Sequence, residues 1–209
     1  MLRLSPFITV YCSVLAALLG ACMASFLNCF SWRIVHGESV LGGRSHCDEC
    51  GHVLSARDLV PVFSYLFSHG KCRYCGKKLS SRHLWGEIIG GVSFVLALFK
   101  YDISLQLLEA WLLGSILMAC AFADLEGYII PDRFIIGGII LFGLSFIWQT
   151  DRLSRLINGA LGGIAVPAVL YIIVLVIEKR LGREAMGGGD IKLLAVTGLF
   201  LGFIGNFLC

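Results

Sequence analysis

The chain has 209 residues, of which 57% are hydrophobic and only 15% are charged, and its mean hydropathy is +0.84. Soluble domains carry nearer a quarter of charged residues, so the composition excludes a soluble enzyme and indicates a polytopic membrane protein. A net charge of +3 is too small to indicate a nucleic-acid partner.

Six apolar segments are long enough, or nearly long enough, to cross a bilayer, which takes about 17–25 residues. We predict transmembrane helices over Phe7–Phe30, Leu84–Phe99, Leu105–Ala123, Phe134–Gln149, Ile157–Ile177 and Ile191–Leu208. The first segment is too long for the core of a signal peptide, so we expect it to be retained. The second and fourth are short and need flanking residues or local thinning of the bilayer. The predicted fold class is therefore all-α, with about six transmembrane helices.

One long polar stretch separates the first two apolar segments. It divides the chain into a first transmembrane helix at residues 1–30, a polar module at residues 31–83, and the remaining helices at residues 84–209. With six spans, 13 of the 17 Lys and Arg residues fall on the side of the membrane that carries this module. Because positive loops stay in the cytoplasm, we predict a cytoplasmic module and an N-terminus outside.

The polar module contains two copies of one short motif. These are Cys47-Asp-Glu-Cys50-Gly and Cys72-Arg-Tyr-Cys75-Gly. The spacing is typical of a zinc site with four cysteine ligands, which leaves no open coordination position and is structural. A redox dithiol pair and an iron–sulfur site are the alternatives. We expect the acids between and around the motifs, including Asp58, to be solvated.

Two carboxylates lie at the ends of apolar segments. Asp124 ends the third segment, and Asp190 begins the sixth directly after Gly187, Gly188 and Gly189. An acid kept beside the bilayer indicates a functional site, and both belong to the predicted cytoplasmic side. Two neighbouring carboxylates can share one proton and activate a water, which is the chemistry of an aspartic protease.

Two further acids allow more than one interpretation. Glu87 lies in the first turn of the second segment, where a structural or substrate-contacting role is about as plausible as simple interfacial placement. Asp132 follows a proline at the start of the fourth segment and is interpreted as a helix cap.

Together these motifs resemble the type IV prepilin peptidases, a family of Gly-x-Gly-Asp membrane aspartyl proteases. The residues that carry the resemblance are Ala24-Ser25-Phe26-Leu27-Asn28, the double CxxC loop, Glu87, Asp124 with Ile-Pro-Asp132, and Gly187-Gly188-Gly189-Asp190-Ile-Lys192. The resemblance implies that Asp124 and Asp190 form the catalytic pair and that Cys47, Cys50, Cys72 and Cys75 bind zinc. Gly187, Gly189, Lys192, Glu87 and Asp132 are expected to support the site.

The resemblance also implies an activity and a location. Such enzymes lie in the bacterial inner membrane and cut the basic leader from prepilin or pseudopilin precursors on the cytoplasmic side. Many then methylate the new N-terminus with S-adenosylmethionine, although this chain has no Gly-rich nucleotide fingerprint. Many relatives continue beyond the sixth segment, so a shortened chain is one expectation.

Two alternatives remain open. The chain could be a peptidase without methyltransferase activity, or a non-enzymatic assembly or transport protein with a structural zinc loop. The absence of a convincing internal repeat disfavours a transporter. The sequence does not indicate an oligomeric state.

Overall fold

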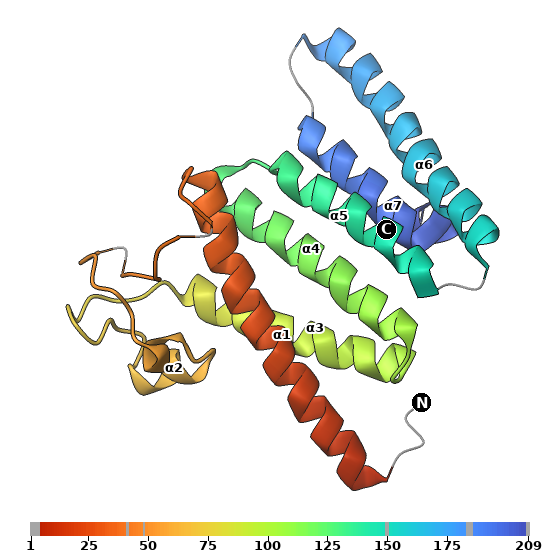
Figure 1. Ribbon diagram of the computed structural model, residues 1–209. Helices are drawn as coiled ribbons and strands as arrows, with labels where there is room; N and C mark the ends of the chain where they lie inside the picture. The colour runs from red at the N-terminus through yellow and green to blue at the C-terminus, as the bar shows by residue number, and fades with distance from the viewer. Residues whose placement is uncertain (1–4, 41, 48, 149–150, 183–185, 208–209) are drawn as a thin grey trace. The chain divides into compact units, whose positions relative to one another are not determined.

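The computed structural model describes residues 5–40, 42–47, 49–148, 151–182 and 186–207. Its regular secondary structure in those residues is helical, which confirms the all-α prediction. The chain forms two compact units, Met1–Tyr128 and Ile129–Cys209, and each is described by itself (Figure 1). The predicted division at residues 30 and 83 follows the polar stretch rather than the packing, and it stays a prediction.

Five helices in the described residues are long and apolar enough to cross a membrane: α1 (Pro6–Val35), α3 (Ser81–Tyr101), α4 (Leu105–Gly127), α6 (Arg152–Leu181) and α7 (Gly188–Phe207). The fourth predicted segment forms α5 (Asp132–Ser145) and the 3-10 turn η2 (Phe146–Trp148). The 14 residues of α5 rise about 21 Å, less than the roughly 30 Å of a hydrocarbon core. The predicted ends Gln149 and Leu208 lie outside the described residues.

In the first unit, α1 crosses α3 at small residues (Figure 1). A Cβ atom added at Gly20 would lie 2.3 Å from the carbonyl oxygen of Gly90, so the two backbones touch. α1 also packs on α4, where the buried Ser31 hydroxyl donates to the carbonyl of Ala119 at 2.9 Å. Small residues and interhelical hydrogen bonds are the usual means of holding helices together in a membrane.

The polar stretch between α1 and α3 contains two short helical segments, η1 (Ala56–Leu59) and α2 (Phe63–Phe67). Of the described residues between 36 and 80, only Cys47, Gly70 and Cys72 are buried. The module therefore has no hydrophobic core of its own, and other contacts must hold its shape.

In the second unit, α6 packs closely against α7. A Cβ atom at Gly198 would lie 2.3 Å from the carbonyl oxygen of Gly162, which again indicates contact between backbones. The buried amide of Asn206 donates to the carbonyls of Gly162 and Leu194 at 2.9 and 3.2 Å. A kink at Gly202, with φ of 72°, brings this end of α7 back toward its own preceding turns.

Candidate functional site

The two CxxC loops adopt the same local conformation. In each, the first cysteine donates its N–H to the carbonyl five residues on, at 3.0 and 2.8 Å, and accepts from the glycine four residues on, at 2.8 and 2.9 Å. These pairs are Cys47–His52 with Gly51–Cys47, and Cys72–Lys77 with Gly76–Cys72. Both glycines have a positive φ, of 67° and 72°, a backbone conformation that residues with a side chain rarely adopt. The repeated sequence therefore forms a repeated turn.

The turns bring the sulfur atoms of Cys47, Cys50, Cys72 and Cys75 within 4.8 Å of one another. A tetrahedral zinc ion with bonds of about 2.3 Å would hold neighbouring sulfurs about 3.8 Å apart, so the spacing suits such an ion. The structure thus joins the four residues that were predicted as metal ligands.

The environment of the four thiols favours ionisation of one of them and opposes it at others. The backbone N–H groups of Cys75 and Tyr74 lower the pKa of Cys72 to about 7. Burial raises the pKa of Cys47. At Cys75 the N–H of Lys77 acts in the lowering direction, but desolvation and the neighbouring thiols together raise the pKa to about 11. A cation bound at the centre of the cluster would favour ionisation of the thiols that surround it.

Asp58 is a structural link that the sequence interpretation missed, because we expected it to be solvated. Its carboxylate accepts from the Ser55 hydroxyl at 2.6 Å and the Ser55 N–H at 3.1 Å, and from the Tyr74 hydroxyl at 3.1 Å. Arg73 lies 3.4 Å away. The Ser55 hydroxyl, followed by these other partners, holds the pKa of Asp58 below its usual value. The acid therefore ties η1 to the second CxxC turn.

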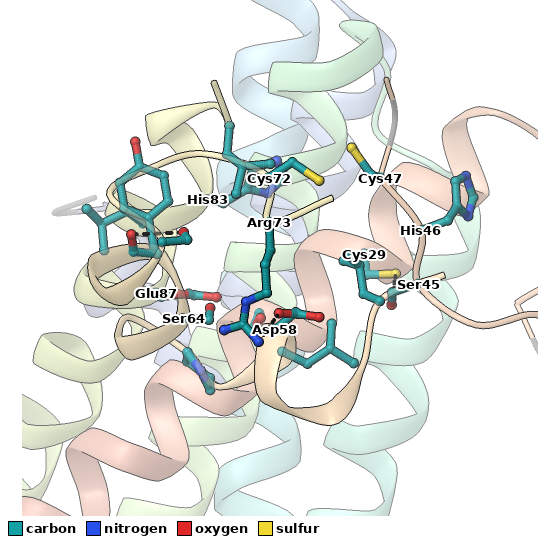
Figure 2. Close-up of a pocket in the computed structure, with 18 of the residues that line it drawn as sticks. Cys29, Ser45, His46, Cys47, Asp58, Ser64, Cys72, Arg73, His83 and Glu87 are labelled. Carbon is teal, nitrogen blue, oxygen red and sulfur yellow. Dashed lines mark hydrogen bonds and ion pairs between the residues drawn. The ribbon is translucent and has the colours of Figure 1, made fainter. Parts of the chain in front are cut away.

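A cavity of about 550 Å³ lies between the module and the neighbouring turns of α1 and α3. Figure 2 shows the Arg73 side chain extending from the second CxxC turn to the Asp58 carboxylate, with Glu87 nearby. The wall also contains aromatic and hydroxyl groups: Trp32, Tyr65, Tyr74, Ser64 and Ser68. The cavity therefore offers both charged and aromatic surfaces, which could not be predicted from the sequence because its walls come together only in the fold.

Glu87 supports the wall of this cavity from α3. Its carboxylate accepts from the N–H of Val62 at 2.7 Å. Val62 has a φ of 63°, an uncommon conformation for a β-branched residue, which indicates a constraint at this point. The structure thus assigns Glu87 a structural contact with the module. Nearby, the Asn28 amide of α1 is hydrogen-bonded to the His83 ring of α3.

Asp124 lies in the last turn of α4 and is exposed. The turn is anchored to the start of α3, because Arg82 donates to the carbonyl of Leu125 at 2.7 Å and lies 3.6 Å from the carboxylate of Glu126. Arg82 was not among the predicted site residues; a cation shortly before an apolar segment is too common to single out. α4 ends at Tyr128 in a left-handed conformation.

Asp190 lies in the first turn of α7 and is exposed. Two of the three preceding glycines have close neighbours: a Cβ atom at Gly189 would lie 3.0 Å from Ile130, and one at Gly187 would lie 3.4 Å from the Asp190 carboxylate. A Cβ atom at Gly188 meets nothing within 4 Å. The glycine run therefore allows the chain to approach Asp190 and Ile130 closely.

Lys192 and Asp132 are brought together at the same end of the second unit, 2.7 Å apart. The prediction that Asp132 caps its helix is wrong, since Pro131 occupies the cap position and Asp132 is the first residue of α5. Its carboxylate accepts from Lys192 instead. The pair shows that α5 and α7 start at one end of this unit. Asp124 and Asp190 belong to different units, and their pairing stays a prediction.

Two family models match the chain. The Bacterial Peptidase A24 N-terminal domain matches residues 18–101, and the Type IV leader peptidase family matches residues 111–208. The first match includes all four cysteines of the cluster, and the second includes both aspartates.

Several relatives are similar over most of the chain. A prepilin leader peptidase/N-methyltransferase of Myxococcus xanthus is 32% identical, with 90% of this chain and 56% of the relative covered. One of Bacillus subtilis is also 32% identical, with 88% and 71% covered. A type 4 prepilin-like proteins leader peptide-processing enzyme of Escherichia coli is 32% identical, with 90% and 77% covered. The chain thus spans between about half and three quarters of these relatives. No solved structure gives a significant match.

Proposed function

The chain belongs to the type IV leader peptidase family, and on that basis we propose that it is an aspartic-type membrane peptidase that cuts the leader from prepilin-like precursors. The observation that carries the proposal is the position of Asp190. It lies in the first turn of a membrane helix, directly after glycines that allow close approach of the chain to Ile130 and to the Asp190 carboxylate. Asp124, in the last turn of another membrane helix, is its proposed partner. Gly187, Gly189, Lys192 and Asp132 support this end of α7.

The helix positions favour different roles for the two acids. The N-terminus of a helix stabilises a negative charge and the C-terminus disfavours one. Asp190 starts α7, so we propose that it carries the charge and takes a proton from the attacking water. Asp124 ends α4, so we propose that it holds the proton and donates a hydrogen bond to the scissile carbonyl.

The cysteine cluster is proposed to hold one structural zinc ion. Four thiolates leave no open coordination position for a substrate or water, so the ion would order the module without taking part in cleavage. The nearly complete lack of buried residues in this module supports the assignment, because metal binding then supplies the folding free energy.

The cavity beside the module is the proposed place for methyl transfer from S-adenosylmethionine. Its volume of about 550 Å³ falls within the usual range for small-molecule sites. The cofactor would supply an electrophilic methyl group on a cationic sulfonium. Aromatic faces such as those of Trp32 and Tyr74, with the carboxylate of Glu87, suit a cationic ligand.

The proposed location is a bacterial inner membrane, with the cysteine module and both acids on the cytoplasmic side and the N-terminus outside. The distribution of Lys and Arg supports this orientation. The substrates would be prepilin or pseudopilin precursors that share the same bilayer.

One assay tests these proposals together. The full chain in lipid nanodiscs is incubated with a purified prepilin precursor and S-adenosylmethionine carrying a labelled methyl group. We expect a shortened pilin that carries the label, and no shortened product from Asp190→Asn. A shortened but unlabelled product would support a peptidase alone. If neither reaction occurs while the cysteine cluster still binds zinc, the protein is better explained as an assembly or transport component.

A further inference from the structure

The short helix α2 points its hydroxyl side chains inward and its apolar side chains outward, the reverse of a helix on the surface of a soluble protein. Ser64, Tyr65 and Ser68 face inward and line the cavity. Phe63, Leu66 and Phe67 face outward, with exposed fractions of 50%, 57% and 75%, and the two phenylalanine rings stack 6.4 Å apart. Exposed aromatic residues grouped in this way mark a surface that contacts another molecule or a membrane.

The segment just before α2 extends the apolar surface. Val60 is 45% exposed and stands one residue before Pro61, whereas the preceding Leu59 lines the cavity. The run from residue 60 to residue 67 therefore presents four large apolar side chains to the outside of the module. We refer to Val60, Phe63, Leu66 and Phe67 as the apolar face.

A hydrogen bond fixes the depth of this face relative to the membrane. The N–H of Val62, the residue before α2, donates to the Glu87 carboxylate of α3. α3 has 21 residues and rises about 31 Å, so it only just spans a hydrocarbon core of about 30 Å. Glu87 lies six residues after Ser81, about 9 Å along the helix. Because helical side chains lean toward the N-terminus, the Glu87 carboxylate lies, along the axis of α3, between the backbone of Ser81 and the backbone of Glu87.

Trp85 is a second residue that indicates where α3 meets the membrane interface. It lies between Ser81 and Glu87 on α3 and is 60% exposed. Tryptophan is enriched at the level of the lipid headgroups, where its ring is apolar and its N–H can reach water. Val62 and the start of α2 therefore lie at the height of the membrane interface.

The backbone of α2 can enter such an environment. Its N–H and carbonyl groups are largely paired within the segment, through bonds of 2.9 to 3.1 Å from Ser64 to Val60, Leu66 to Val62, Ser68 to Ser64, His69 to Leu66 and Gly70 to Tyr65. A segment can leave water only if its backbone N–H and carbonyl groups are hydrogen-bonded, because lipid offers them no partners. If α2 entered the interface, its apolar side chains would move from water to lipid, and no unpaired backbone group of the segment's hydrogen-bonded turns would be exposed to the lipid.

We propose that α2 is an interfacial anchor, which inserts Phe63, Leu66 and Phe67 into the boundary between lipid headgroups and acyl chains. The cysteine module is then held against the bilayer surface by two contacts, the Glu87 bond and the apolar face. One consequence rests on the proposed function: the cavity, which shares α2 as a wall, would open at the depth where the cut end of a membrane-embedded pilin emerges.

The test places a trifluoromethyl-phenylalanine probe at position 67 of the full chain in nanodiscs. A matched probe replaces Lys78, an exposed cation in the second CxxC loop that must remain in water. Fluorine spectra are recorded with lipids that carry a spin label near the headgroup end of the acyl chain, and separately with a gadolinium chelate in water. We expect the spin-labelled lipid to broaden the position 67 signal at least about threefold more than the position 78 signal, and the chelate to reverse the order.

Two outcomes would overturn the proposal. If the chelate broadens both signals alike and the lipid label affects neither, the apolar face lies in water. If both reagents spare position 67, protein covers the face, either the second unit or another copy of the chain. Bound zinc is measured in both labelled proteins, so that loss of the module's fold is not mistaken for either result.

Discussion

The cysteine module and the α6–α7 pair are stabilised by different kinds of contact. In the module, thiols and hydrogen-bonded side chains connect turns that bury almost nothing, and Asp58 alone joins Ser55, Arg73 and Tyr74. In the α6–α7 pair, backbones meet directly at Gly162 and Gly198. The difference indicates that the module depends on hydrogen bonds, charge and the proposed metal ion, whereas the helix pair depends on shape. The two should therefore fail independently.

The largest effect is expected from removing the metal site. Cys72→Ser removes a buried sulfur of the proposed zinc site, and loss of a structural zinc site forfeits on the order of 10 kcal/mol of binding free energy. We expect loss of bound zinc and rapid proteolysis of residues 36–80, with the thermal unfolding of the transmembrane helices nearly unchanged. Cys22→Ser, at an exposed cysteine outside the cluster, serves as the control. Retention of zinc by the Cys72 variant would argue against the four-thiolate site.

The second effect concerns the proposed catalytic pair. Asp190→Asn and Asp124→Asn each remove a group proposed to transfer or hold a proton, so we expect the rate of leader cleavage to fall by about a thousandfold or more. Zinc content and helix unfolding should match those of the unchanged protein. Glu38→Gln, at an exposed acid after α1, is the control. Cleavage within tenfold of normal by either asparagine variant would remove that aspartate from the proposed pair.

The third effect concerns the close contact between α6 and α7. Gly198→Ala places a Cβ atom 2.3 Å from the carbonyl oxygen of Gly162 and 2.6 Å from the Asn206 amide, so the helices must separate. We expect the second unit to lose about 1–3 kcal/mol of stability, measured by unfolding in mixed detergent, without loss of zinc. Gly143→Ala is the matched control, because a Cβ atom there meets nothing within 4 Å. Equal stability of the two variants would show that the close contact is not needed.

The smallest effect is expected at Asp58. Asp58→Asn weakens the bonds with Ser55, Tyr74 and Arg73, and we expect the module to lose about 1–2 kcal/mol at pH 7, measured by protection of its amides from hydrogen exchange. Because the folded pKa lies below the ordinary value of 3.8, the stabilisation is complete above that value and disappears as pH falls through the folded pKa. The helices should exchange as before. A uniform loss of protection in all helices would mean that the two regions are coupled.

Local patterns in the sequence determined much of this protein. The apolar segments predicted the helices, because a bilayer of given thickness requires a given number of apolar residues, and the short fourth segment became the short helix α5. The two CxxC-Gly motifs predicted both turns, because their spacing and glycine determine the turn geometry within six residues. All four cysteines were therefore identified before their sulfur atoms were placed together.

Contacts between distant residues were decided only by the tertiary structure. Asp58 became a half-buried link, Asp132 paired with Lys192 sixty residues away, and Glu87 bound the N–H of Val62. An acid carries the same charge whether it is solvated, capping a helix or paired, so its role depends on which partner the fold brings within about 3 Å. The outward face of α2 depends on tertiary structure for the same reason: one turn of mixed apolar and hydroxyl residues does not specify which side meets the cavity.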